Sequence, residues 1–184
     1  MKNLICLLLC TSLFISNAQM NQEITTPDGK QFLLGKITLD GLQAGPYSSW
    51  YESGYENYVV DQTLIQMFKK QLNTYEVKLF LGTWCGDSKR QVPRLAKILK
   101  AAAFPMEKLE VVALDRRRDT YKTSPGGEEK GLNIVKVPTI IFLKNGKEIN
   151  RIIERPIESL EEDISAIVNQ KGYTPNYAHL KRAR

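Results

Sequence analysis

The chain has 184 residues, of which 42% are hydrophobic and 25% are charged. This length and composition are typical of one soluble globular domain with its own core, and they exclude two ordinary domains. Lysine and arginine together number 26 against 20 acidic residues, which gives a net charge of +6. Because no recognition motif accompanies this modest excess, we expect no nucleic-acid partner.

The first eighteen residues have the pattern of a secretory signal peptide. Lys2 precedes an apolar stretch at residues 4–15, and residues 16–18 form a small-x-small cleavage site. That stretch is shorter than the roughly 20 residues of a spanning helix, so cleavage ranks above an uncleaved anchor, and we expect no stable membrane insertion. A lipoprotein with Cys10 lipidated is a minor alternative, because Leu9 is a poor fit to the small residue that processing prefers. We therefore expect a periplasmic or secreted protein.

Cleavage after Ala18 would remove Cys6 and Cys10 and leave Cys85 as the single cysteine of the mature protein. Disulfides normally form in exported compartments, so an unpaired cysteine there suggests a reactive thiol or an intermolecular partner. The sole histidine, His179, lies near the C-terminus, which argues against a Cys–His nucleophilic pair and a histidine-based metal site. We expect neither a metal nor a cofactor.

Residues 19–60 are predicted to form an N-terminal extension. A polar start with a Pro-Asp-Gly turn leads to an accessory strand at residues 32–39, broken near Gly35. Residues 41–58, rich in glycine, serine and aromatic side chains, are predicted to form an aromatic loop without regular structure. Two interpretations stay open: the rings pack over one edge of a sheet, or they form one wall of a groove near Cys85.

Residues 61–172 alternate between helical and strand patterns, whereas residues 173–184 look like a loose basic tail. The predicted elements are a helix at 62–72 capped by Asp61, a strand at 77–81, a helix at 86–103 kinked at Pro93, a strand at 109–114, a hairpin of 139–143 and 148–153 around Asn145-Gly146, and a last helix from Pro156 to Gly172. This order predicts an α/β fold with a central mixed sheet and helices on both faces.

The turn Trp84-Cys85-Gly86-Asp87-Ser88 joins the strand at 77–81 to the following helix. Free backbone N–H groups and the helix dipole at a helix start favour an anion, so a thiol there is biased toward thiolate. Lys89 and Arg90 would favour the thiolate further, whereas the Asp87 carboxylate opposes it, and the sequence leaves this balance open.

This cysteine turn, Pro93 and the later Val137-Pro138-Thr139 together resemble the thioredoxin superfamily over about residues 61–170. The resemblance implies a thioredoxin-like fold in which Cys85 is the nucleophile. It also implies a cis bond before Pro138, which places Val137 where its backbone pairs with an extended partner chain. The residues that it assigns to partner binding are Trp84, Gly86, Asp87, Val137 and Thr139.

Ser88 departs from the superfamily pattern, because it stands where the second cysteine of Cys-x-x-Cys belongs. Serine cannot attack a mixed disulfide, so an external thiol must release any partner bound to Cys85. The Ser88 hydroxyl could still donate a hydrogen bond to the Cys85 thiolate. The superfamily's buried acid falls on Leu79 and its lysine partner on Val111, so the proton acceptor for a second thiol is missing together with that thiol.

The Trp-Cys turn and its Lys89-Arg90-x-x-Pro93 continuation are similar to exported thiol–disulfide proteins of the TlpA and ResA type, although those carry two cysteines. We therefore predict thiol–disulfide exchange through Cys85, with Ser88 and Pro138 as the other catalytic-site residues. The expected partners are exported proteins with thiols or disulfides, and a low-molecular-weight or protein thiol. One alternative is a non-catalytic thioredoxin-fold binding module. Another, a glutathione-linked monothiol enzyme, lacks an identifiable glutathione motif.

Overall fold

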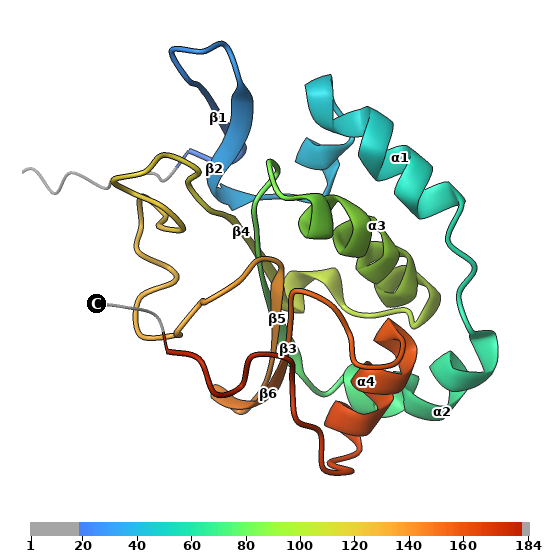
Figure 1. Cartoon of the computed structure of the whole chain (residues 1–184). Coiled ribbons are helices and arrows are strands. Elements are labelled where there is room, and N and C mark those ends of the chain that lie inside the picture. The colour runs from blue at the N-terminus through green and yellow to red at the C-terminus, as the bar shows by residue number, and fades with distance from the viewer. Residues whose placement is uncertain (1–18, 182–184) are drawn as a thin grey trace, which may run out of the picture.

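A six-stranded mixed sheet runs through the part of the chain that the computed structural model describes, residues 19–181 (Figure 1). The predicted signal peptide lies outside these residues. The strands are β1 (Gln22–Thr25), β2 (Gln31–Ile37), β3 (Glu76–Leu81), β4 (Leu109–Ala113), β5 (Thr139–Lys144) and β6 (Lys147–Ile153). Their order across the sheet is β1-β2-β4-β3-β5-β6.

Four α-helices accompany the sheet in the described chain. They are α1 (Ser48–Glu56), α2 (Gln62–Leu72), α3 (Gly86–Ala101) and α4 (Leu160–Val168). Asp61 caps α2 as predicted, accepting a hydrogen bond from the backbone N–H of Leu64 at 2.9 Å. The last helix begins later than predicted, at Leu160, where the Ser159 hydroxyl caps it. None of the helices within residues 19–181 combines the length and the apolar character needed to cross a bilayer.

The central strand β3 is parallel to β4 and antiparallel to β5. Its apolar run is covered on both faces, as expected of a strand in the middle of an α/β sheet. Leu79 of β3 lies opposite Val111 of β4, and both side chains are buried. At these two positions, which the resemblance assigns to the superfamily's buried acid and lysine, this chain therefore has an apolar contact that avoids the cost of burying charge.

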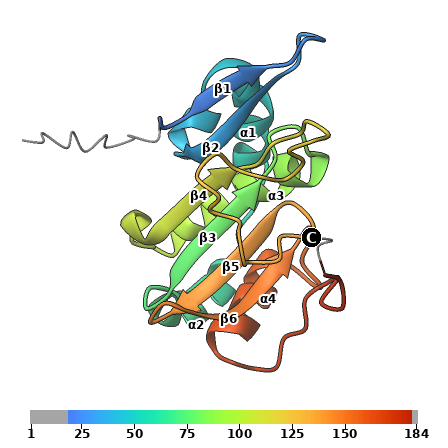
Figure 2. The same ribbon diagram turned by 90° about the vertical axis from the view of Figure 1, so that its left-hand side faces the viewer.

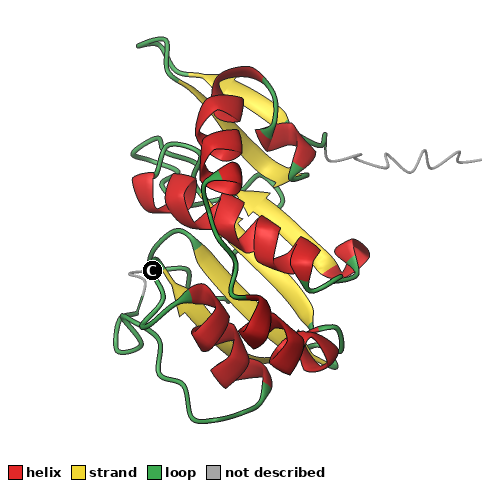
Figure 3. Ribbon diagram, turned by 90° about the vertical axis from the view of Figure 1, so that its right-hand side faces the viewer, coloured by secondary structure: helices red, strands yellow, loops and turns green. Residues whose placement is uncertain are grey.

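The mixed sheet with four helices is confirmed, but the helices do not cover both of its faces. All four described α-helices pack on one face (Figure 3), where they share one core with alternate residues of the strands. The opposite face is covered by the connection between β4 and β5 (Figure 2), through Leu114, Ile134 and Val137. This connection contains a Pro-Gly-Gly break and many charged residues, so it forms a long loop rather than a helix.

The N-terminal extension is part of the same sheet, because β1 and β2 form a hairpin and β2 pairs with β4. The predicted break near Gly35 is wrong. The strand continues through Gly35 at a φ of +84°, a conformation that glycine adopts without steric cost, and Gly35 pairs with Ala113.

The prediction of an aromatic loop at residues 41–58 is also wrong, because this segment contains two short 3₁₀ helices and α1. Tyr47, Tyr51 and Tyr55 recur every four residues, which places them along one side of a helix. Tyr47 and Tyr51 are buried, and α1 packs against α3. The Tyr47 hydroxyl donates a hydrogen bond to the Glu23 carboxylate of the edge strand β1 at 2.8 Å, and Tyr47 and Tyr51 share a core with Leu33 of β2, so the interpretation that the rings pack over one edge of the sheet is confirmed for these two.

The described end of the C-terminal segment, residues 173–181, is not a loose tail. The Tyr173 hydroxyl donates a hydrogen bond to the Asp163 carboxylate at 2.6 Å, and the Asn150 side chain donates to the Tyr173 carbonyl at 2.8 Å. Further along, the amide of Asn133 donates to the carbonyl of Leu180 at 3.1 Å. These contacts hold the segment against β6 and the loop before β5.

Candidate active site

Cys85 is the N-cap residue of α3, at the carboxyl end of β3. Its backbone N–H donates to the Gly82 carbonyl at 2.8 Å, which closes the turn between strand and helix. The side chain is half-buried, and it is the free cysteine of the described chain. The thiol donates a hydrogen bond to the carbonyl oxygen of Val137 at 3.2 Å. The fold thus brings together two motifs that lie 52 residues apart in the sequence.

The Val137–Pro138 peptide bond is cis, as the resemblance implies. Two hydrogen bonds hold this segment: Glu154 N–H donates to the Pro138 carbonyl, and the Thr139 hydroxyl donates to the Lys136 carbonyl, each at 2.7 Å. Thr139 is fully buried, so its side chain fixes the loop from inside. The backbone N–H of Val137, the residue whose carbonyl accepts the Cys85 thiol, has no acceptor within the described chain.

Ser88 is fully buried, and its hydroxyl oxygen accepts a hydrogen bond from the backbone N–H of Gly82 at 3.2 Å. The hydrogen bond of the Cys85 thiol goes to Val137, so within the described chain Ser88 does not donate to Cys85 as the sequence analysis considered. Ser88 therefore holds the turn rather than the sulfur.

Two of the charged side chains near Cys85 carry opposite charges and neutralise each other. Asp87 and Arg90, one helical turn apart, form an ion pair. This pairing answers part of the question that the sequence left open, because the carboxylate that would oppose a thiolate carries its own counter-charge. Both side chains are partly exposed, so the pair contributes little to stability. Gly86 is exposed beside them.

Trp84 is anchored to the loop that covers the second face of the sheet. Its indole N–H donates to the carbonyl of Leu114 at 2.9 Å, and its ring lies 5.3 Å from that of Tyr121, centroid to centroid. The indole is half-buried. The residue before the cysteine is thus positioned by the end of β4 and by the loop that follows it.

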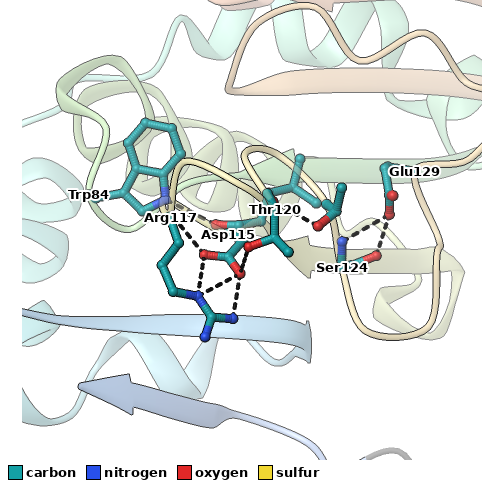
Figure 4. Close-up of polar contacts among 8 residues, drawn as sticks. Trp84, Asp115, Arg117, Thr120, Ser124 and Glu129 are labelled. Atoms are coloured by element: carbon teal, nitrogen blue, oxygen red, sulfur yellow. Dashed lines mark hydrogen bonds and ion pairs between the residues drawn. The ribbon is translucent and has the colours of Figure 1, made fainter. Parts of the chain in front are cut away.

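Asp115, directly after Leu114, organises that loop from a buried position (Figure 4). Its carboxylate accepts hydrogen bonds from the backbone N–H and guanidinium of Arg117, and from the Thr120 hydroxyl at 2.7 Å. Burial alone would raise the pKa of Asp115, but the bonds from Arg117 and Thr120 outweigh it, so the pKa lies below its ordinary value. Sequence reasoning missed this cluster; its one signal was an acidic residue directly after a buried strand.

A second carboxylate orders the far half of the same loop. Glu129 is buried and accepts a hydrogen bond from the backbone N–H of Ser124 at 3.1 Å, and the Ser124 hydroxyl bonds to Glu129 and Glu128. Together the Asp115 and Glu129 clusters give a loop without helices a defined path back to Val137. Within residues 19–181, no group of three or more His, Cys, Asp or Glu side chains is placed to hold a metal ion.

Comparison with known proteins gives matches among thioredoxins. A family model described as thioredoxin matches residues 46–166. Thioredoxin H-type 1 of Nicotiana tabacum is 29% identical over 101 residues, which are 54% of this chain and 72% of that protein. Among solved structures, mitochondrial thioredoxin 3 of Saccharomyces cerevisiae in its oxidized form is 29% identical, with 50% of this chain and 73% of that chain covered and a TM-score of 0.31. Fasciola hepatica thioredoxin is 21% identical, with 56% and 90% covered and a TM-score of 0.36.

The family match covers more than half of the chain and includes both parts of the site, the turn with Cys85 and the segment with Val137 and Pro138. The chain therefore belongs to the thioredoxin family.

Proposed function

We propose that this protein is an exported thiol–disulfide exchange protein of the TlpA or ResA type that works through one thiol, Cys85. One observation carries the proposal: the thiol is half-buried at the start of α3 and bonds to the carbonyl of Val137, a residue whose N–H has no acceptor among the described residues. A helix start favours a thiolate, and an unpaired N–H is a place for a partner's backbone to bind.

In the proposed reaction, the Cys85 thiolate attacks one sulfur of a partner's disulfide. A bond forms between the two sulfurs, the partner's disulfide breaks, and the second partner sulfur leaves as a thiolate. Ser88 cannot attack the mixed disulfide, so an external thiolate attacks the Cys85 sulfur and releases the partner's first thiol. A second external thiol then frees Cys85. The two external thiols end as a disulfide, and they supply the two electrons that reduce the partner.

Val137 is proposed to hold the partner in an extended conformation during this exchange. Its N–H donates to a partner carbonyl, as in the addition of a strand to an exposed backbone. Its carbonyl, which accepts the S–H of Cys85 in the free protein, becomes available to a partner N–H once the thiol loses its proton. One residue thus offers a donor and an acceptor beside the attacking sulfur.

Trapping of partners tests the proposal. Wild type, Cys85→Ala and Ser88→Ala, each expressed with its leader, are captured from the exported fraction after thiol blocking and separated without reductant. We expect disulfide-linked partners with the wild type and with Ser88→Ala, and none with Cys85→Ala. The mass of the wild-type protein should correspond to a chain that begins at Gln19.

Alkylation separates exchange from mere binding. We expect iodoacetamide to react with Cys85 at pH 7 several times faster than with free cysteine. A rate no greater than that of free cysteine, together with partners that Cys85→Ala captures equally well, would contradict the redox proposal and favour a non-catalytic binding module.

A further inference from the structure

A cavity of about 560 Å³ opens between α1 and the C-terminal half of α3. Its apolar wall includes Tyr51, Ala96 and Phe104. Ala96 lies eleven residues along α3 from Cys85, or about 16 Å at the rise of an α-helix. The cavity is therefore a site separate from the thiol, and its volume is that of a small-molecule pocket.

Tyr51 gives this cavity a hydrogen-bond donor that the protein itself does not use. The side chain is only 4% exposed, and no hydrogen bond joins its hydroxyl to another residue of the described chain. Tyr51 lines the cavity, and its hydroxyl is not among the fully buried unpartnered polar atoms of the described chain. Burial, followed by the nearby Tyr55 and Asp40, raises the pKa of Tyr51 to about 12, which keeps the proton in place at neutral pH. The hydroxyl is therefore a donor that water reaches, and a ligand in the cavity could accept its hydrogen bond in place of water.

The rim of the cavity is acidic. Asp40, Glu52 and Glu56 all line it, and none of the three is within ion-pair distance of a cation in the described chain. Two cations lie near this wall: Lys100 lines the cavity with its Nζ 5.9 Å from the centroid of the Tyr55 ring, and the Lys97 Nζ lies 5.3 Å from the same ring and donates to the Glu56 carbonyl at 3.1 Å. Three carboxylates against two ammonium groups leave an excess of one negative charge beside the apolar wall.

We propose that this cavity binds a small organic cation: a protonated amine on an aromatic or aliphatic body that carries a hydrogen-bond acceptor for Tyr51. The amine lies among Asp40, Glu52 and Glu56, the body packs on Ala96 and Phe104, and the acceptor receives the Tyr51 O–H. Complementary charge at the rim selects the sign of the ligand, and the hydroxyl orients it.

Three probes of one shape test the charge preference. Tyramine is cationic at pH 7, tyrosol is its neutral alcohol, and 3-(4-hydroxyphenyl)propionate is its anion. Titrated into the ¹⁵N-labelled protein, tyramine should shift amide resonances of α1 and of α3 from Ala96 onward. It should bind at least 5-fold more tightly than tyrosol, and the anion should not bind. Equal binding of cation and anion, shifts centred on Cys85, or no tyramine binding up to 10 mM would each overturn the proposal.

Variants assign the contacts. Tyr51→Phe keeps the ring and should weaken tyramine by about 5-fold through loss of one hydrogen bond. The double variant Glu52→Gln with Glu56→Gln should weaken the binding of tyramine and leave the binding of tyrosol unchanged. Glu107→Gln removes an exposed charge outside the cavity lining and should change the affinity for neither tyramine nor tyrosol. If Tyr51→Phe keeps a dispersed spectrum and full tyramine affinity, the proposed donor is wrong. Cys85→Ala should bind as the wild type does, so this test is independent of the redox proposal.

Discussion

The hydroxyl oxygen of Ser88 accepts a hydrogen bond from the backbone N–H of Gly82 at 3.2 Å, while the Gly82 carbonyl accepts from the N–H of Cys85 at 2.8 Å. Gly82 thus joins the cysteine and the residue at the second motif position in one turn. Because Ser88 is fully buried, its side chain replaces the second thiol of a dithiol site with a structural contact.

Ser88→Cys should create dithiol activity. The new thiol would lie one helical turn after Cys85, so it can attack a mixed disulfide at Cys85 without an external thiol. We expect reductase turnover with a dithiol reductant to rise at least 10-fold from a negligible wild-type rate. Sulfur accepts hydrogen bonds weakly, so loss of the Gly82 contact should cost about 1 kcal/mol of unfolding free energy. The insulin-reduction rate and a urea titration measure the two effects.

Ser88→Ala is the matched control, because it loses the same hydrogen bond without gaining a thiol. It should be destabilised by a similar amount and show no turnover. If Ser88→Cys folds but gains no activity over Ser88→Ala, the proposed position of residue 88 relative to Cys85 is wrong.

Trp84→Phe should loosen the loop that covers the second face of the sheet. The change keeps an aromatic ring but removes the N–H that donates to Leu114, a loss of about 1 kcal/mol in unfolding free energy. Trp50→Phe is the control, since its half-buried indole makes no hydrogen bond in the described chain. Circular dichroism during urea unfolding compares them. Equal midpoints for the two variants would contradict the anchoring role of Trp84.

The sequence predicts the elements that depend on local patterns and misses those that depend on contacts between distant segments. The helix α2, the strand β3 and the hairpin of β5 and β6 follow from local patterns: a capping aspartate, a continuous apolar run and Asn-Gly at a tight turn. α1 was missed because its serines and glycine outweigh the four-residue spacing of Tyr47, Tyr51 and Tyr55. The helix α1 is stabilised by packing on α3, and the sequence of residues 41–58 alone gives no sign of this long-range contact.

The candidate site divides in the same way. The superfamily motifs are sufficient to predict that Cys85 and Val137 lie together, as the 3.2 Å contact bears out. The direction of the Ser88 side chain depends on the backbone of Gly82, and the place of Asp115 depends on which loop residues turn back toward it. Both sets of hydrogen bonds form only once the chain has folded, and the sequence carries no periodic pattern that predicts them.

Asp115 should make stability depend on pH in the acid range. Its pKa in the folded protein lies below its value in the unfolded chain, because Arg117 and Thr120 stabilise the carboxylate. The unfolded state therefore takes up a proton first as the pH falls. The contribution of Asp115 is complete above about pH 5, declines below the unfolded pKa of about 3.9, and is gone once the pH is below the folded pKa.

Asp115→Asn should remove that dependence and cost about 1–3 kcal/mol at pH 7, since the donors of Arg117 and Thr120 lose a charged acceptor. The difference in unfolding free energy between wild type and variant should shrink from pH 6 to pH 3. Asp119→Asn, a charge change in the same loop outside the Asp115 hydrogen bonds, is the control and should change stability little. A difference that stays constant over this range would contradict the proposed role of ionised Asp115.

Gly54→Ala should destabilise the packing of α1 on α3. Alanine is the better helix former by about 1 kcal/mol, so propensity alone favours the change. A Cβ at Gly54, however, would lie 2.6 Å from Cγ of Pro93, and the proline ring cannot rotate away. We expect a net loss of about 1–3 kcal/mol in unfolding free energy, as for other overpacked contacts. Urea unfolding of the variant measures it.

Two further variants isolate that clash. A Cβ at Gly86, at the start of α3, would have no heavy atom within 4 Å, so Gly86→Ala should be neutral or slightly stabilising. Pro93→Ala combined with Gly54→Ala removes the ring, and the double variant should be more stable than the sum of the two single changes predicts. Strict additivity, or a Gly54→Ala variant as stable as the wild type, would mean that α1 does not lie on Pro93. The helical layer beside Tyr51 would then need a different arrangement.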